Sequence, residues 1–142
     1  MIKVTDDKSQ IIFSGVIKAA YRSKDRDKNG NIKEDSELKN VITVFPDDEK
    51  VFDQINAYEK SGDNYTPTWF KEREFVKLKS AFDIPVKAED KEMTFVEFLE
   101  RGLIKGGQVI VKFIQKDGSI YPLAILEKEP GEKFDAFEGM ED

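Results

Sequence analysis

The chain has 142 residues, of which 39% are hydrophobic and 37% are charged, and its net charge is −6. This length suits one domain with its own core, and the hydrophobic content is too high for a disordered chain. The sequence contains neither cysteine nor histidine, which excludes thiolate nucleophiles, imidazole bases and ordinary zinc sites. We therefore expect a non-enzymatic protein without a metal or a cofactor.

The acidic excess lies at the C-terminus. Residues 127–142 contain seven acids and two lysines, a net of −5, so residues 1–126 carry only −1. Apolar runs are too short to span a membrane, and the N-terminus lacks the basic and apolar segments of a signal peptide. The absence of disulfides agrees with a cytoplasmic location. We expect a nearly neutral body followed by an acidic tail.

Residues 11–22 mix β-branched and aromatic side chains and predict a long first strand, with Gly15 as a candidate bulge. Strict alternation would place Tyr21 on one face of this strand, and Lys18 and Arg22 on the other.

A polar excursion follows over residues 23–37, and its Asn29-Gly30 pair is a strong hairpin signal. Residues 40–45 predict a second strand that pairs with the first. After Pro46, apolar residues from Val51 to Tyr58 recur at helical spacing and predict a helix that ends near residues 61–64.

The second half of the chain predicts three more strands and one helix. Residues 75–80 alternate cleanly as a third strand, and residues 84–86 are short and extended. A capping box formed by Thr94 and Glu97 predicts a short helix ending at Gly102.

Residues 108–115 and 120–127 predict the fourth and fifth strands, joined by a tight hairpin over residues 116–119. Pro122 within the last strand indicates an edge or a bulge. The pattern of five strands and two short helices, with several strands apolar on both faces, favours a mainly β, OB-fold-like Greek-key barrel over residues 1–127. Residues 128–142 are expected to be a disordered acidic, aromatic tail.

The strongest candidate for a binding surface lies in residues 69–79. If this segment is extended throughout, one face is aromatic and basic, which suits stacking on bases and neutralising phosphates of single-stranded nucleic acid. That face would carry Trp69, Lys71, Arg73, Phe75, Lys77 and Lys79. The alternative is that Trp69 and Phe75 belong to the core beside a solvated lysine face.

Smaller groups could join the same surface. Lys18, Tyr21 and Arg22 end the first strand, and Lys112 and Tyr121 lie on the late strands. Taken singly, each is better explained as an ordinary surface cation or a half-buried tyrosine, and only their convergence on one groove would give them a function.

The excursion also matches part of a calcium-binding EF-hand loop. Asp25, Asp27, Asn29, Gly30 and Ile32 occupy the expected positions. The required glutamate at the twelfth position is replaced by serine, and the flanks are strands rather than helices. The simpler interpretation is a hairpin tip.

The tail sets apolar side chains among carboxylates, a pattern that suits a docking peptide whose aromatic anchors enter pockets on a partner protein. The candidate partner-binding residues are Phe134, Asp135, Phe137, Glu138 and Met140. A solubilising tail is the alternative.

Residues 75–86, 94–113 and 117–142, with 13–21 and 40–45, resemble bacteriophage single-stranded-DNA-binding proteins with an OB-fold, in particular replication proteins of phages of Gram-positive bacteria. The resemblance implies a protein that coats single-stranded DNA during phage replication or recombination in the host cell cytoplasm. It also implies a homodimer whose tail recruits replication or recombination proteins. Tails of this kind typically end in phenylalanine, whereas this one ends in Met140-Glu-Asp.

Two functions follow as hypotheses. The first is largely sequence-independent binding of single-stranded DNA. The second is an acidic phage inhibitor or DNA mimic that blocks a host enzyme. Mimicry needs carboxylates spread over a folded surface, and here the acidic excess is concentrated in the tail.

Overall fold

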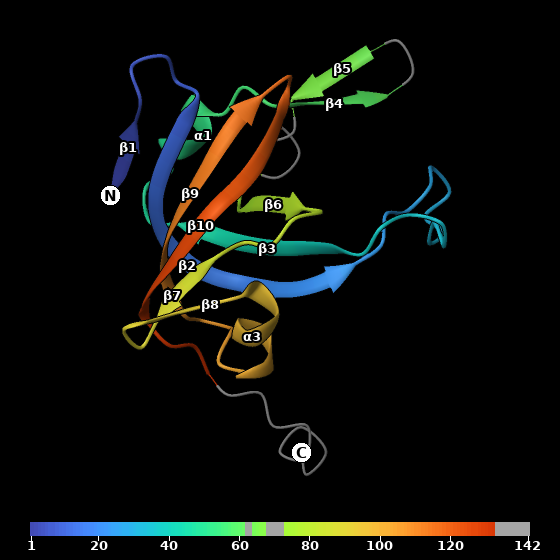
Figure 1. The fold of residues 1–142 in the computed structure, drawn as a ribbon. Coiled ribbons are helices and arrows are strands. Elements are labelled where there is room, and N and C mark those ends of the chain that lie inside the picture. The colour runs from blue at the N-terminus through green and yellow to red at the C-terminus, as the bar shows by residue number, and fades with distance from the viewer. Residues whose placement is uncertain (62–63, 68–72, 133–142) are drawn as a thin grey trace.

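The fold is known from a computed structural model that describes residues 1–61, 64–67 and 73–132 (Figure 1). Within these ranges the chain forms ten strands and two short helices. The strands are β1 (Ile2–Val4), β2 (Gln10–Ser23), β3 (Lys39–Pro46), β4 (Tyr58–Ser61), β5 (Asn64–Pro67), β6 (Val76–Ser80), β7 (Val86–Ala88), β8 (Lys91–Met93), β9 (Gln108–Lys116) and β10 (Ser119–Glu129). The helices are α1 (Val51–Gln54) and α3 (Phe95–Glu100).

Eight strands form one sheet in the order β6-β3-β2-β9-β10-β7-β8, with β1 paired to β2 outside this path. The pair β4–β5 forms a separate hairpin that projects from the sheet (Figure 1). Neighbouring strands are antiparallel except β10 and β7, which are parallel. The mainly β class with short helices is therefore confirmed. The prediction of only five strands was wrong, because sequence alternation detected the long strands and missed the short ones.

Strand β2 holds the sheet together. Its first half pairs with β9 from Gln10 to Val16, and its second half pairs with β3 from Gly15 to Ser23. Figure 1 shows β2 curving strongly along this length. The hydrogen-bonded order ends at β6 and β8, so the sheet of the described residues is open, although β6 approaches β10 without pairing to it.

The core fills the concave side of this curved sheet. Four phenylalanines, Phe13, Phe95, Phe98 and Phe113, are its largest fully buried side chains. Phe13 and Phe113 lie on paired strands and meet edge to face, with ring centroids 5.8 Å apart. Two of the four come from α3, so this short helix contributes as much aromatic core as the strands do.

The bulge in β2 differs from the prediction in both place and effect. Its pairing with β3 shifts between Ile17 and Ala19, so the extra residue is Lys18 and not Gly15. Because one extra residue reverses the alternation, Tyr21 faces the same side as Lys18, and Arg22 faces the opposite side. Gly15 instead allows a close approach, since a Cβ there would lie 2.4 Å from the Phe45 carbonyl oxygen.

The predicted first helix is much shorter than expected. Helix α1 ends at Gln54, and Tyr58 begins strand β4. Val51, Phe52 and Ile55 are buried as the helical spacing predicted. The prediction failed beyond them because three apolar residues at this spacing specify only about one turn.

The later elements match the sequence closely. Thr94 and Glu97 form the predicted capping box, and the chain turns at Gly102 with φ +73°. Strand β6 begins one residue after the expected start, and the β9–β10 hairpin turns at Asp117 and Gly118. Register shifts between Pro122 and Ala124, as the bulge alternative predicted, and Pro122 pairs only with β9, because β7 joins β10 at Ile125 and Leu126.

The end of the body lies beyond the predicted boundary at residue 127. Strand β10 continues to Glu129, and the Gly131 and Glu132 amides donate to the Leu103 and Lys105 carbonyls. The five tail residues proposed for partner binding lie outside the described residues. Neither helix of the described ranges is long and apolar enough to cross a bilayer.

Candidate nucleic-acid interface

The convex sides of β2, β3 and β6 form one continuous surface. The pairing aligns Ala19, Thr43 and Lys77 in one row, and Tyr21, Val41 and Lys79 in the next. The neighbouring rows, which contain Ile42, Leu78 and Val44, point into the core. We call the outward surface the basic-aromatic face. It consists of Lys18, Tyr21, Lys39, Phe45, Phe75, Lys77 and Lys79.

One end of this face is an aromatic pair with a lysine above it. Phe45 and Phe75 meet edge to face with centroids 6.3 Å apart, and the Lys18 ammonium lies 3.6 Å from the centre of the Phe75 ring. A cation at this distance is attracted by the π-electrons of the ring. The bulge in β2 therefore directs Lys18 onto Phe75, and a base could stack on this side of Phe75 only by displacing the ammonium.

The middle of the face combines an exposed ring with lysines. Tyr21 is 38% exposed, whereas Val41 beside it is fully buried without belonging to the core cluster. Val41 is flanked by Tyr21 and Lys79, so we infer that their apolar portions cover it. Lys77 is exposed and has no ion-pair partner among the described residues.

At the other end, one carboxylate joins two of the lysines. Asp25 accepts hydrogen bonds from Lys39 at 2.7 Å and from Lys79 at 3.0 Å. These bonds lower the pKa of Asp25, the one from Lys39 most, so the carboxylate stays ionised at neutral pH. Two lysines share one acid, and this group therefore retains a positive charge.

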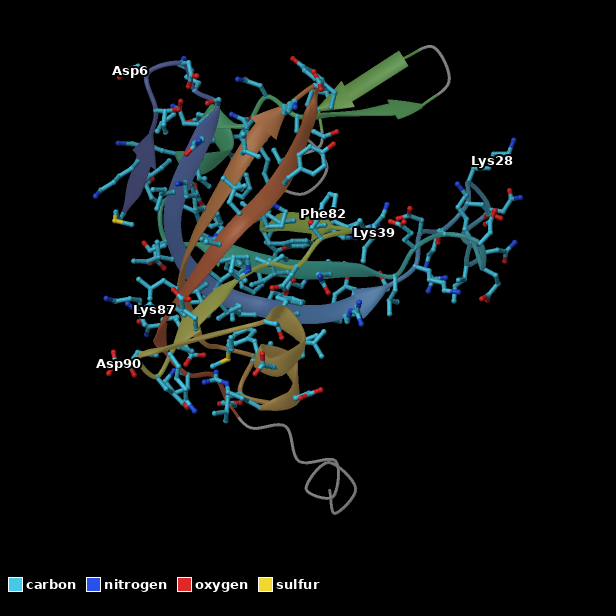
Figure 2. All side chains as sticks on the ribbon, in the orientation of Figure 1. Asp6, Lys28, Lys39, Phe82, Lys87 and Asp90 are labelled. Carbon is cyan, nitrogen blue, oxygen red and sulfur yellow. The ribbon has the colours of Figure 1, made fainter. Side chains whose placement is uncertain are left out.

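Asp25 lies near the start of a projecting segment, residues 24–38, which we call the arm. A groove of about 550 Å³ lies between the arm and the face, lined by Tyr21, Ser23, Lys24, Asp25, Arg26, Lys33, Lys77 and Lys79. Five cations and one acid line it. Lys24 pairs with Glu34 at 3.4 Å, which reduces the excess only slightly because Glu34 is largely exposed. Figure 2 shows the arm projecting far from the sheet, with Lys28 at its tip and Lys39 at its base.

The structure brings together five of the predicted nucleic-acid-binding residues: Lys18, Tyr21, Phe75, Lys77 and Lys79. Arg22 is separated from them by the bulge and donates to Asn40 at 3.0 Å on the other side of the strand. Arg73 lies in a turn and pairs with Asp53 at 2.9 Å. The condition that residues 69–79 be extended throughout is therefore not met at residues 73–75, which form a turn and a bend. Trp69 and Lys71 lie outside the described residues.

Lys112 and Tyr121 are placed elsewhere. Lys112 lies on β9 between Ile12 and Ala124 of its neighbours, at the half of β2 that precedes the bulge. Tyr121 lines a different groove. Neither joins the basic-aromatic face.

Sequence reasoning missed Arg26, Lys33, Lys39 and Phe45 as members or neighbours of this surface. Lys39 and Phe45 could have been found by extending alternation along the second strand. Arg26 pairs with Ile32 across the base of the hairpin, and the next residue, Lys33, bonds through its amide to the Asp25 carbonyl. The charges of this hairpin follow no period, so the sequence carried no signal for Arg26 and Lys33.

The acids of the partial EF-hand pattern have other contacts. Asp25 binds two lysines, and the Asp27 carboxylate accepts the Asn29 and Asn31 amides at 2.9 and 3.0 Å. The latter contacts close the hairpin turn, where Gly30 has φ +83°. Within the described residues no group of three or more acidic side chains is arranged to hold a metal ion.

Comparison with known proteins leaves the surface to be interpreted from its own chemistry. No protein-family model, no curated protein and no solved structure matches this chain. What the arrangement can do is bind a polyanion along three adjacent strands, because fixed ammonium groups attract phosphates and the Tyr21 ring offers a flat apolar surface.

Proposed function

We propose that the protein binds single-stranded DNA with little sequence preference, as a non-enzymatic coat during phage replication or recombination. The single observation that supports this most strongly is the basic-aromatic face. Among the described outward positions of β2, β3 and β6 there are four lysines, two aromatic residues and no acid, and a third aromatic residue, Phe75, directly precedes β6. Its one neighbouring carboxylate, Asp25, is already shared by two lysines.

Each part of the face has a role in this proposal. Lys77, Lys79 and the cations of the arm neutralise phosphates, and Tyr21 stacks on a base. Phe75 positions Lys18 rather than stacking itself, because the ammonium occupies its ring. A single strand fits better than a duplex, since unpaired bases expose the flat surfaces that an aromatic ring can contact.

The resemblance described above supports three further parts of the proposal. The curved sheet is a variant of the OB-fold barrel. The protein works as a homodimer in the host cytoplasm. The tail recruits replication or recombination proteins through its aromatic residues, Phe134 and Phe137, and through Met140.

The proposal is tested by titrating fluorescently labelled oligo-dT with the protein and measuring anisotropy at several salt concentrations. We expect binding that weakens as salt increases, because binding releases counterions from the phosphates. Replacing both Lys77→Gln and Lys79→Gln should reduce the slope of log affinity against log salt by about 1.4, since each single-strand phosphate contact contributes roughly 0.7.

The matched control replaces two lysines at a distant site, Lys87→Gln with Lys91→Gln on β7 and β8. Figure 2 places Lys87 far from Lys39 and the arm. The control changes the net charge equally and should leave the slope unchanged. If wild-type protein binds no oligo-dT at low salt, the proposed function is wrong, and the acidic-inhibitor hypothesis becomes the better one.

A further inference from the structure

Phe82 is the most exposed large hydrophobic side chain of the described residues, with 82% of its surface accessible. Its backbone is nevertheless fixed. The Phe82 amide donates to the Ser80 hydroxyl at 3.0 Å, and its carbonyl accepts from the buried Asn40 amide at 2.9 Å. Leaving a phenylalanine in water forfeits about 1.5–3 kcal/mol of burial energy. An anchored backbone that presents an exposed ring indicates a binding role for that ring.

The ring borders a groove of about 530 Å³ between the end of β6 and strand β10. Tyr121, which is 44% exposed, also lines the groove. Ile114, Pro122 and Leu123 form its apolar remainder, and Lys116 lies at its rim. The groove therefore offers two aromatic rings on an apolar floor, which is the surface that unpaired bases contact.

This groove continues the basic-aromatic face. Lys79 and Phe82 are three residues apart, so at most about 11 Å of chain separates them. Asn40, on the opposite side of β3 from the face, accepts from Arg22 and donates to the Phe82 carbonyl, which fixes the chain just after β6. A strand of nucleic acid that leaves the face past Lys79 would reach Phe82 next.

The groove suits a nucleotide through its rings, because its charged lining includes only one cation, Lys116, which is exposed and can meet a phosphate. Arg22 does not line the groove, but it bonds to Asn40, which also contacts Phe82, and it makes no ion pair among the described residues. Two acids, Asp83 and Asp117, also line the groove. The Asp83 carboxylate accepts the Phe95 amide at the start of α3 at 2.9 Å, which partly compensates its charge.

We propose that the groove containing Phe82 and Tyr121 is a second base-stacking site, which holds nucleotides leaving the basic-aromatic face at its Lys79 end. This inference rests on the proposed function and extends it. The exposed ring of the face is Tyr21, because Phe45 packs against Phe75 and Lys18 lies over Phe75. The groove supplies the additional rings that a longer strand needs.

The experiment uses the full chain and a series of oligo-dT lengths, from roughly 4 to 16 nucleotides, the range of OB-fold site sizes. Phe82→Ala combined with Tyr121→Ala should weaken binding of the longer oligonucleotides by about 5-fold to 100-fold per lost stacked base. Binding of the shortest ones, which the face can hold alone, should change little. Leu126→Ala, which truncates another exposed apolar residue of β10, is the matched control and should have no effect.

A direct readout places a fluorophore in the groove. Phe82→Trp in a Trp69→Phe background should be quenched by long oligo-dT, and a Leu126→Trp variant in the same background should not. Phe82 and Leu126 are both exposed, so placing a tryptophan at either position should not unfold the protein. Melting curves of the two variants verify this.

Three outcomes separate the two proposals. If the double alanine variant binds every length as wild type does, while Lys77→Gln with Lys79→Gln weakens binding, the second site is wrong and the proposed function stands. If the double alanine variant instead changes the sedimentation of the free protein without changing DNA affinity, the groove is a contact between copies of the chain and the second site is again wrong. If wild-type protein binds no oligo-dT, the proposed function fails first.

Discussion

Asp25 lies between two lysines that would otherwise both be available to a phosphate. Its hydrogen bonds to Lys39 and Lys79 fix these side chains at the entrance to the arm. They also lower its pKa, so protonation does not release the lysines near neutral pH. A bound phosphate must therefore compete with a carboxylate already present.

We expect Asp25→Asn to tighten binding of oligo-dT. The substitution removes a negative charge from the groove and frees a lysine, so the salt dependence should steepen by about 0.7 in slope for one added phosphate contact. Anisotropy titrations at several salt concentrations measure this.

Asp90→Asn is the control for Asp25→Asn. It makes the same change of charge at a position that Figure 2 shows far from Lys39, and asparagine suits the positive φ of residue 90. Weaker binding by Asp25→Asn than by wild type would contradict a competing role and would indicate that the carboxylate positions the lysines for DNA.

At the residue scale, the sequence predicted the site only where alternation was uninterrupted. Lys77 and Lys79 were placed correctly because β6 is short and regular. Tyr21 and Arg22 could not be assigned to the right faces, because the bulge at Lys18 leaves no mark in the pattern of apolar residues. Phe82 was missed because the sequence alone does not distinguish an exposed phenylalanine from a buried one.

At the scale of the element, β2 packs against β3 without room for a side chain at Gly15. A Cβ at this position would lie 2.4 Å from the Phe45 oxygen and 2.6 Å from the Val44 side chain. Both neighbours belong to a paired strand, and Val44 is fully buried, so neither can move freely. The glycine is required by space and not by its own dihedral angles.

Gly15→Ala should destabilise the fold by about 1–3 kcal/mol, the usual cost of overpacking a well-filled site. Urea denaturation measures the loss of unfolding free energy. Ser23→Ala, at the exposed end of the same strand, should stay within about 0.5 kcal/mol of wild type. An unchanged midpoint for Gly15→Ala would show that β3 shifts without cost.

Secondary-structure elements were predicted correctly where adjacent residues specify the conformation by themselves. The capping box of α3 and the Asp117-Gly118 turn specify their conformations through a few adjacent residues. Strands β1, β7 and β8 have three residues each, which is too short for alternation to be recognised. β1 and β8 pair with neighbouring strands β2 and β7, whereas β7 also pairs with the distant β10, a contact that no local pattern encodes.

At the scale of the whole molecule, charge is segregated. The cations of the basic-aromatic face and the arm lie on one part of the surface. A third groove, between β8 and α3, is lined by Glu89, Glu92, Glu97 and Glu100, with Lys91 and Arg101. Its arginine is mostly buried and pairs with Glu89 and with the buried Glu127. The net charge of −6 is therefore compatible with a basic binding surface.

Deleting residues 133–142 tests whether the acidic terminus affects the face. The segment carries four acids and one lysine, so its removal raises the net charge from −6 to −3. We expect an unchanged melting temperature and binding of oligo-dT that is as tight or tighter at low salt, because fewer carboxylates compete for the lysines. Calorimetry and anisotropy measure the two effects. A lower melting temperature or weaker binding would show that the segment contributes to the folded body or to the interface.

The long strand β2 also determines when the protein can fold. Gln10 pairs with Ile114, and Ile11 pairs with Phe113. The N-terminal half of β2 therefore cannot complete its pairing until about a hundred further residues have been synthesised. Such distant pairings make folding slow, on the order of milliseconds to seconds. During synthesis, the first half of the sheet exists without its partner strand. Until β9 is made, the backbone of β2 from Gln10 to Val16 lacks that partner, and an unpaired strand edge of this kind can pair with other nascent chains.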